Sequence, residues 1–150
     1  MSSVHEKSNA IAPFSETKWL ILSSSVCFGV PLVLALYLKE YAYALHFGNI
    51  VILSANYWRN ARYNWHRTMD VTYARYNVCM FFYNAFMYCR HPSIVFLAHA
   101  IYWSYNKGIA LYYKKNQTWV RYHMLFHFLT SCGQTLFLYN MHNTNIKQHI

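Results

Sequence analysis

The chain alternates between long apolar stretches and short polar or basic connections. The apolar stretches cover residues 19–38, 40–58, 68–89, 93–113 and 119–139. The first contains no charged residue, and its twenty residues are enough to cross about 30 Å of hydrocarbon as a helix. The other four are of similar length. We therefore predict an all-α fold, a polytopic transmembrane helical bundle with about five spans.

The two ends of the chain are more polar than its middle. Residues 1–18 contain two of the four acidic residues, and we expect a polar N-terminal tail there. Residues 19–141 would form the transmembrane bundle and residues 142–150 a polar C-terminal tail. The first apolar stretch is too long for the core of a signal peptide and lacks a small-residue cleavage site. We expect it to stay in the protein as an anchor.

The composition agrees with a membrane protein. Hydrophobic residues make up 56% of the chain and aromatic residues 20%, and fifteen tyrosines lower the mean hydropathy to +0.06. The net charge of +9 could indicate nucleic-acid binding, but the cations lie at the ends of apolar stretches, where membrane proteins carry them. We expect membrane lipids as partners, with a membrane-protein partner or a homo-oligomer also open, and no nucleic acid.

The distribution of lysine and arginine predicts the orientation. With the N-terminus in the cytoplasm, eight cations fall on the inner side and three on the outer side. Five spans then place the C-terminus on the opposite side of the membrane. The four cysteines, at positions 27, 79, 89 and 132, form no C-x-x-C pair, so we expect buried, reduced thiols rather than a zinc finger or a redox site.

Polar residues recur at spacings that place them on one face of a helix. Asp70, Asn77 and Asn84 repeat every seven residues, and His99 and Asn106 repeat in the same way. His123, His127, Thr130 and Gln134 also share a face. These groups are costly against lipid, so we expect the polar faces to meet inside the bundle. The simplest interpretation is helix packing, since such hydrogen bonds contribute roughly 1 kcal/mol each.

Asp70 is the only acidic residue outside the first forty, and it opens the third apolar stretch. A carboxylate in a membrane span needs a partner or a proton. Its candidate partners are Arg67, His66 and Arg75, and a structural ion pair with an arginine is one interpretation. A functional role is the other.

Four residues from distant parts of the chain are expected at one membrane depth: Ser54, Asp70, His123 and His127. Two histidines at i and i+4 can ligate one zinc ion, and a nearby carboxylate can orient a bound water. A zinc-bound hydroxide would suit attack on an amide or ester carbonyl. The alternative is that the histidine pair makes polar contacts within the bundle.

The order of these residues resembles the CREST superfamily of membrane hydrolases, which includes the alkaline ceramidases and the progestin and adiponectin receptors. The resemblance covers roughly residues 54–70 and 123–133. It implies zinc bound by His123 and His127, with Asp70 as the base and Ser54 as an oxyanion or water contact. The family's third histidine ligand falls on Trp58, and indole cannot ligate zinc. His66 is the candidate replacement.

Three functions follow from this sequence. We favour a non-catalytic membrane component, such as a subunit, a scaffold or a lipid-binding factor, because little of the chain lies outside the apolar stretches. The alternative is a reduced CREST-like, metal-dependent lipid amide or ester hydrolase. The third is a proton or ion pathway lined by Asp70, His99, His123 and His127, because histidine titrates near neutral pH.

Overall fold

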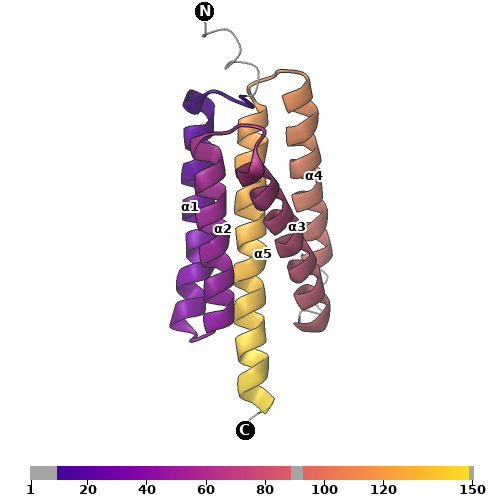
Figure 1. Ribbon diagram of the computed structural model, residues 1–150. Coiled ribbons are helices and arrows are strands. Elements are labelled where there is room, and N and C mark those ends of the chain that lie inside the picture. The colour runs from indigo at the N-terminus through magenta and orange to yellow at the C-terminus, as the bar shows by residue number, and fades with distance from the viewer. Residues whose placement is uncertain (1–9, 89–92, 149–150) are drawn as a thin grey trace, which may run out of the picture.

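The protein is a bundle of five α-helices in a computed structural model, which describes residues 10–88 and 93–148 (Figure 1). The helices are α1 (Phe14–Tyr37), α2 (Tyr41–Arg59), α3 (Trp65–Tyr88), α4 (Ser93–Tyr113) and α5 (Trp119–Gln148). Within these residues the only β structure is an isolated bridge between Ala10 and Arg62. The prediction of an all-α helical bundle is confirmed.

Helix α5 is the centre of the bundle. It packs against α1, α3 and α4, while α2 packs against α1 and α3 (Figure 1). Helix α4 rests mainly on α5, so much of its remaining surface is exposed. The connections are short, so consecutive helices run antiparallel, and the first turn of α1 and the last turn of α5 lie at opposite ends of the bundle.

Two tight turns hold the helix pairs α1–α2 and α4–α5. Lys39 (φ 61°) and Lys115 (φ 52°) adopt the left-handed conformation just after α1 and α4. At the first turn the backbone N–H groups of Lys39 and Glu40 return to the carbonyls of Leu36 and Ala35. This is the Schellman pattern, which satisfies the last carbonyls of a helix, and Lys115 and Asn116 repeat it after α4. Both positions would be less strained with glycine.

The helices extend beyond the apolar stretches at both ends of the chain. Helix α1 begins at Phe14, inside the expected N-terminal tail, and α5 continues to Gln148, through most of the expected C-terminal tail. Before α1, the backbone N–H of Ile11 donates to the carbonyl of Ala61 at 2.8 Å. The predicted boundaries at residues 18 and 141 therefore do not mark helix ends, because hydropathy indicates where a chain leaves apolar surroundings and not where a helix stops.

The buried apolar residues form two clusters, one toward each end of the bundle. The cluster around Phe47 joins α1, α2 and α5 and includes Phe28, Phe137 and Leu138. The other cluster lies near the start of α5 and contains Leu20, Tyr57, Trp58, Ala61, Trp119 and Val120. The predicted histidine pair lies close to this second cluster.

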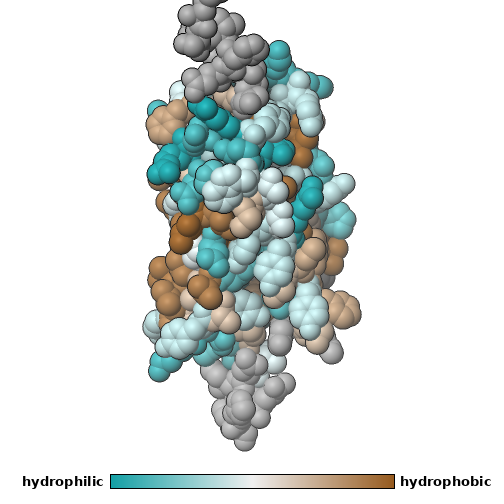
Figure 2. Space-filling view, viewed as in Figure 1, coloured by the Kyte–Doolittle hydropathy of each residue, from teal (hydrophilic) through white to brown (hydrophobic). Residues whose placement is uncertain are grey.

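Among the described helices, only α1 is both long and apolar enough to cross a membrane by its composition. The other four carry too many Tyr, Asn, His and Arg residues. Many large apolar side chains are nevertheless exposed, among them Val33 (66%), Phe86 (83%) and Phe96 (76%). In Figure 2 apolar patches lie along the middle and lower part of the bundle, and hydrophilic residues gather near the start of α1. The polytopic membrane arrangement stays a prediction.

Candidate functional site

The predicted histidine pair lies on α5 in an aromatic box. The rings of His123 and His127 are 4.8 Å apart in an edge-on arrangement, as expected for i and i+4 on one helix face. Trp58 from α2 meets His123 at a ring distance of 5.2 Å, and Phe28 from α1 meets His127 at 5.5 Å. His127 is 4% exposed. Three helices thus enclose the pair.

Only one of the four ring nitrogens in this pair forms a hydrogen bond with the described residues. The Nδ1 atom of His127 lies 2.9 Å from Ser23 Oγ on α1, and Ser23 also lies 3.2 Å from the carbonyl of Leu20. Within the described residues, no hydrogen bond reaches His127 Nε2 or either nitrogen of His123. A neutral imidazole nitrogen that carries no hydrogen can accept a hydrogen bond or ligate a metal. The other three ring nitrogens are therefore free of the described residues and could form hydrogen bonds or bind a metal ion.

Asp70 lies on α3 near the same end of the bundle, half-buried. It is within electrostatic range of Tyr57, whose ring packs at 4.5 Å against Trp58, the neighbour of His123. Among the described residues no ion pair with Asp70 is found, so its pairing with Arg67, His66 or Arg75 stays one interpretation. Arg67 instead lies over the ring of Tyr63, at 4.9 Å.

The other two predicted site residues do not join the histidine pair through any described hydrogen bond. Ser54 is buried on α2, 4% exposed. His66 stacks on its neighbour Trp65, with ring centres 3.8 Å apart. In the described part of the chain, no three His, Cys, Asp or Glu side chains come close enough together to hold a metal ion. Zinc binding by His123, His127 and His66 stays a prediction.

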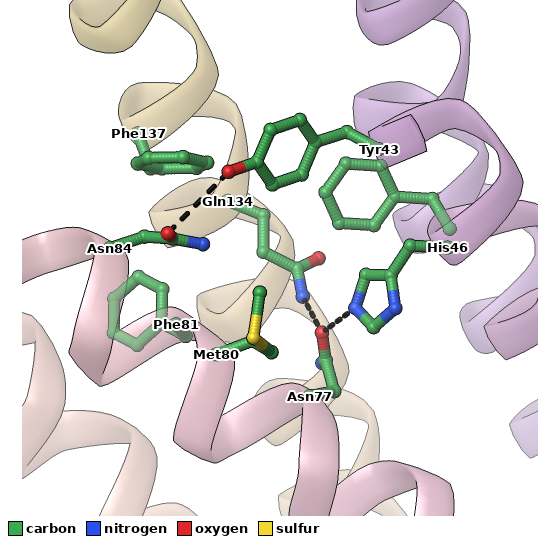
Figure 3. Close-up of a pocket in the computed structure, with 9 residues that line it drawn as sticks. Tyr43, His46, Asn77, Met80, Phe81, Asn84, Gln134 and Phe137 are labelled. Carbon is green, nitrogen blue, oxygen red and sulfur yellow. Dashed lines mark hydrogen bonds between the residues drawn. The ribbon is translucent and has the colours of Figure 1, made fainter. Parts of the chain in front are cut away.

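A second polar site, which was not predicted as a functional site although its residues belong to the predicted inward polar faces, lies between α2, α3 and α5 (Figure 3). His46 Nε2 lies 2.8 Å from Asn77 Oδ1, and Gln134 Nε2 donates to the same oxygen at 2.6 Å. Because an amide oxygen only accepts, His46 Nε2 carries the hydrogen. In a neutral ring, Nδ1 then accepts from the Tyr73 hydroxyl at 3.0 Å. Both nitrogens of His46 are therefore satisfied.

A small pocket adjoins this network. Its lining residues are Tyr43, His46, Phe47, Asn77, Met80, Phe81, Asn84, Gln134 and Phe137. On its far side the hydroxyl of Tyr43 donates to Asn84 Oδ1 at 3.4 Å. Two buried polar atoms on α5, Gln134 Oε1 and Thr135 Oγ1, have no hydrogen-bond partner among the described residues. Only the first of these belongs to a residue that lines the pocket.

The seven-residue repeats identified part of this arrangement. Asn77, Asn84, His127 and Gln134 are buried, as expected. His99 and Asn106 are exposed, so the expectation that they face the interior is wrong. Their side chains turn back to their own helix, His99 Nδ1 toward the carbonyl of Val95 at 2.7 Å and Asn106 Nδ2 toward that of Tyr102 at 2.8 Å. A repeat places residues on one face but does not say which face is covered.

The sequence did contain a signal for the second site. Tyr43, His46 and Asn49 follow each other at intervals of three on α2, so they lie along one side of that helix. Tyr73 similarly precedes Asn77 by four residues on α3. Tyrosine is typical of membrane interfaces, but its hydroxyl also serves as a hydrogen-bonding group inside this bundle.

Comparisons with protein-family models, with curated proteins and with solved structures find no match. The CREST resemblance therefore rests on Ser54, Asp70 and the His123–His127 pair alone. Function has to be inferred from the geometry of the two polar sites and from the outer surface of the bundle.

Proposed function

We propose that this protein is a multi-span, non-catalytic membrane component: a subunit, a scaffold or a lipid-binding factor. One observation supports this most strongly. Large apolar side chains are exposed on every helix, for example Val33 on α1, Leu45 on α2, Phe86 on α3, Phe96 on α4 and Leu136 on α5. Amide, hydroxyl and imidazole groups lie in the interior beside the two apolar clusters. This distribution suits a bundle surrounded by lipid or by other apolar helices.

The charges support a defined orientation. Exposed cations gather where α2 leads into α3 and α4 leads into α5: Arg59, Lys114, Lys115 and Arg121. At the opposite end, the described α1–α2 turn has only Lys39 beside Glu40. The more basic end is the one that membrane proteins keep in the cytoplasm, where anionic lipids attract it. The start of α1 is then cytoplasmic and the end of α5 lies on the other side.

The two Schellman turns offer a matched test of this orientation. Lys39→Cys and Lys115→Cys change equivalent left-handed lysines at opposite ends of the bundle. In sealed cells, a membrane-impermeant maleimide should label the Lys39→Cys variant and should reach Lys115→Cys only after permeabilisation. The wild type, with its native cysteines, gives the background. Equal labelling of both variants in sealed cells, or recovery of the protein in the soluble fraction, would contradict the proposal.

The saturated interior around His46 supports a structural role over catalysis. The polar groups of His46, Asn77 and Tyr73 use one another as partners, which joins α2 to α3. Gln134 adds α5 through its bond to the Asn77 oxygen. A non-catalytic component should tolerate Asp70→Asn in a cell-based assay and should co-purify with fixed membrane partners. A strict requirement for the Asp70 carboxylate, with normal protein abundance, would count against it.

A second function, a CREST-like metal-dependent hydrolase, is favoured by a different observation. Three ring nitrogens of His123 and His127 form no hydrogen bond with the described residues. Trp58, which packs against His123, occupies the sequence position where the family has a histidine. If the pair binds zinc, purified protein should contain it in a stoichiometric amount. Changing both histidines to alanine should abolish the metal content, while His99→Ala, on the exposed side of α4, should leave it unchanged. Wild-type protein without metal at neutral pH would end this alternative.

A further inference from the structure

The pocket between α2, α3 and α5 contains a buried acceptor that the described residues leave without a donor. Gln134 is 3% exposed, and its Oε1 has no partner among them. The other half of the same amide is fixed, because Nε2 donates to Asn77 Oδ1, which His46 also contacts. In Figure 3 the Gln134 oxygen points away from Asn77. Buried carbonyls are nearly always paired, so a donor other than the described side chains is expected here.

A donor lines the same pocket. Asn84 is 4% exposed, and its Oδ1 accepts from the Tyr43 hydroxyl. Its Nδ2 makes no hydrogen bond within the described part of the chain and is turned toward Gln134 in Figure 3. The pocket thus presents one acceptor from α5 and one donor from α3, with aromatic rings as the other walls.

We propose that this pocket binds one neutral hydroxyl group. Its O–H donates to Gln134 Oε1, and its oxygen accepts from Asn84 Nδ2. A cation would find no carboxylate among the lining residues, and an anion would face the oxygens of Gln134 and Asn77. The small size of the pocket and its ring-lined walls fit a group no larger than a water or the head of a short alcohol.

Thr135 provides an internal comparison. Its Oγ1 is also buried without a described partner, but Thr135 does not line the pocket. If the unpaired oxygen of Gln134 is satisfied by a bound hydroxyl, removing it should have consequences that removing the Thr135 hydroxyl does not. The bound group also bridges α3 and α5, which otherwise meet less extensively than α5 meets α1 or α4.

Side-chain amide NMR of the isotopically labelled wild-type protein in detergent micelles tests the proposal. A bound water should give cross-peaks from the water resonance to the amide protons of Asn84 and Gln134. Exposed Asn106 is the control, because its amide protons should show only the signal that arises from rapid exchange with bulk water. A bound alcohol should instead give saturable shifts of Asn84 and Gln134 on titration with 1-butanol, with loss of the water cross-peaks. Assigned amides with neither a water contact nor a saturable shift would overturn the proposal.

Two variants make the test independent of one spectrum. Gln134→Met removes the acceptor at similar volume and should abolish the contact at Asn84 while lowering the Tm by several degrees. Thr135→Val should leave the Asn84 contact intact and the Tm nearly unchanged. A contact at Asn84 that survives Gln134→Met would contradict the proposed bridge. If Gln134→Met does not fold, the wild-type and Thr135→Val spectra decide the question on their own.

Discussion

The bundle contains two histidine sites that differ in how much of their hydrogen-bonding capacity the fold uses. At the His46 site, Tyr73 and Asn77 engage both ring nitrogens, and Gln134 shares the Asn77 oxygen. At the His123–His127 site, only Ser23 makes a described hydrogen bond, and tryptophan and phenylalanine rings form the remaining walls. The first histidine is committed to linking helices, whereas the second site retains nitrogens that could bind something else.

This difference separates two reasons for placing imidazole inside a bundle. A saturated histidine stabilises one arrangement of helices, and its loss leaves neighbours without partners. An unsaturated pair in an aromatic box contributes packing, and its spare nitrogens are useful only if a ligand reaches them. Stability measurements should therefore respond most strongly at the His46 site, and metal-dependent measurements should respond only at the His123–His127 site.

The largest effect is expected from Asn77→Leu. This change keeps the volume but removes the oxygen that both His46 Nε2 and Gln134 Nε2 contact, so one half-buried and one buried donor lose their partner. Each such loss costs about 1–3 kcal/mol, so the free energy of unfolding should fall by roughly 2–6 kcal/mol. Reversible denaturation in mixed micelles measures it.

Asn106→Leu is the matched control for that change. Asn106 is exposed and bonds only to the carbonyl of Tyr102 on its own helix. Its replacement should change the free energy of unfolding by no more than about 0.5 kcal/mol. Equal losses in the two variants would mean that the His46 network contributes nothing beyond an ordinary surface amide.

The next effect is a gain of function at the other site. Trp58→His places a third imidazole beside His123, where the indole now packs. Three histidines are a sufficient protein ligand set for zinc. Within this variant, zinc at one hundred times its Kd should raise the free energy of unfolding by about 2.7 kcal/mol, seen as a zinc-dependent rise in Tm.

The same substitution at Trp103, an exposed residue of α4, should give no zinc response. Adding His127→Ala to Trp58→His should abolish the response as well. If Trp58→His shows no zinc dependence while it remains folded, the arrangement of α2 and α5 does not bring the three rings to a common point, and the CREST resemblance loses its structural meaning.

A smaller effect is expected from Ser23→Ala. The change removes the only described hydrogen-bond partner of His127 Nδ1 and leaves a buried imidazole nitrogen unpaired. We expect a loss of about 1–3 kcal/mol in the free energy of unfolding. Ser24→Ala is the control, because Ser24 is also buried but, among the described residues, bonds only to the carbonyl of Ile21 in its own helix. Indistinguishable losses would show that the Ser23–His127 contact adds nothing.

The number and approximate position of the helices could be predicted from the sequence, because long apolar stretches are a strong and local signal. Their ends could not. Residues 142–144 are polar but compatible with a helix, and Thr144 Oγ1 bonds back to the carbonyl of Asn140. Lys39 and Lys115 adopt the left-handed conformation at the ends of α1 and α4. Glycine at these positions would have predicted a helix end, whereas lysine does not.

The candidate sites divide in the same way. That His123 and His127 lie side by side followed from helix geometry alone. That Trp58 packs against His123, or that Tyr73 reaches His46, depends on how α2 rotates against its neighbours, which no local pattern specifies. The rotation of α4 about its own axis likewise decides that His99 and Asn106 are exposed, although their spacing equals that of buried Asn77 and Asn84.

The smallest effect separates the hydroxyl of Tyr73 from its ring. Tyr73→Phe removes the donor to His46 Nδ1 and the acceptor for Asn49 Nδ2 but keeps the ring contact with His46 at 5.3 Å. Because phenylalanine offers neither a donor nor an acceptor, His46 Nδ1 loses this partner in either tautomer, and a loss of about 1 kcal/mol is expected. Tyr76 also meets the His46 ring, at 5.5 Å, but no described residue bonds its hydroxyl. Tyr76→Phe should therefore be neutral, and an equal loss in both would assign the stabilisation to ring packing rather than to the saturated histidine.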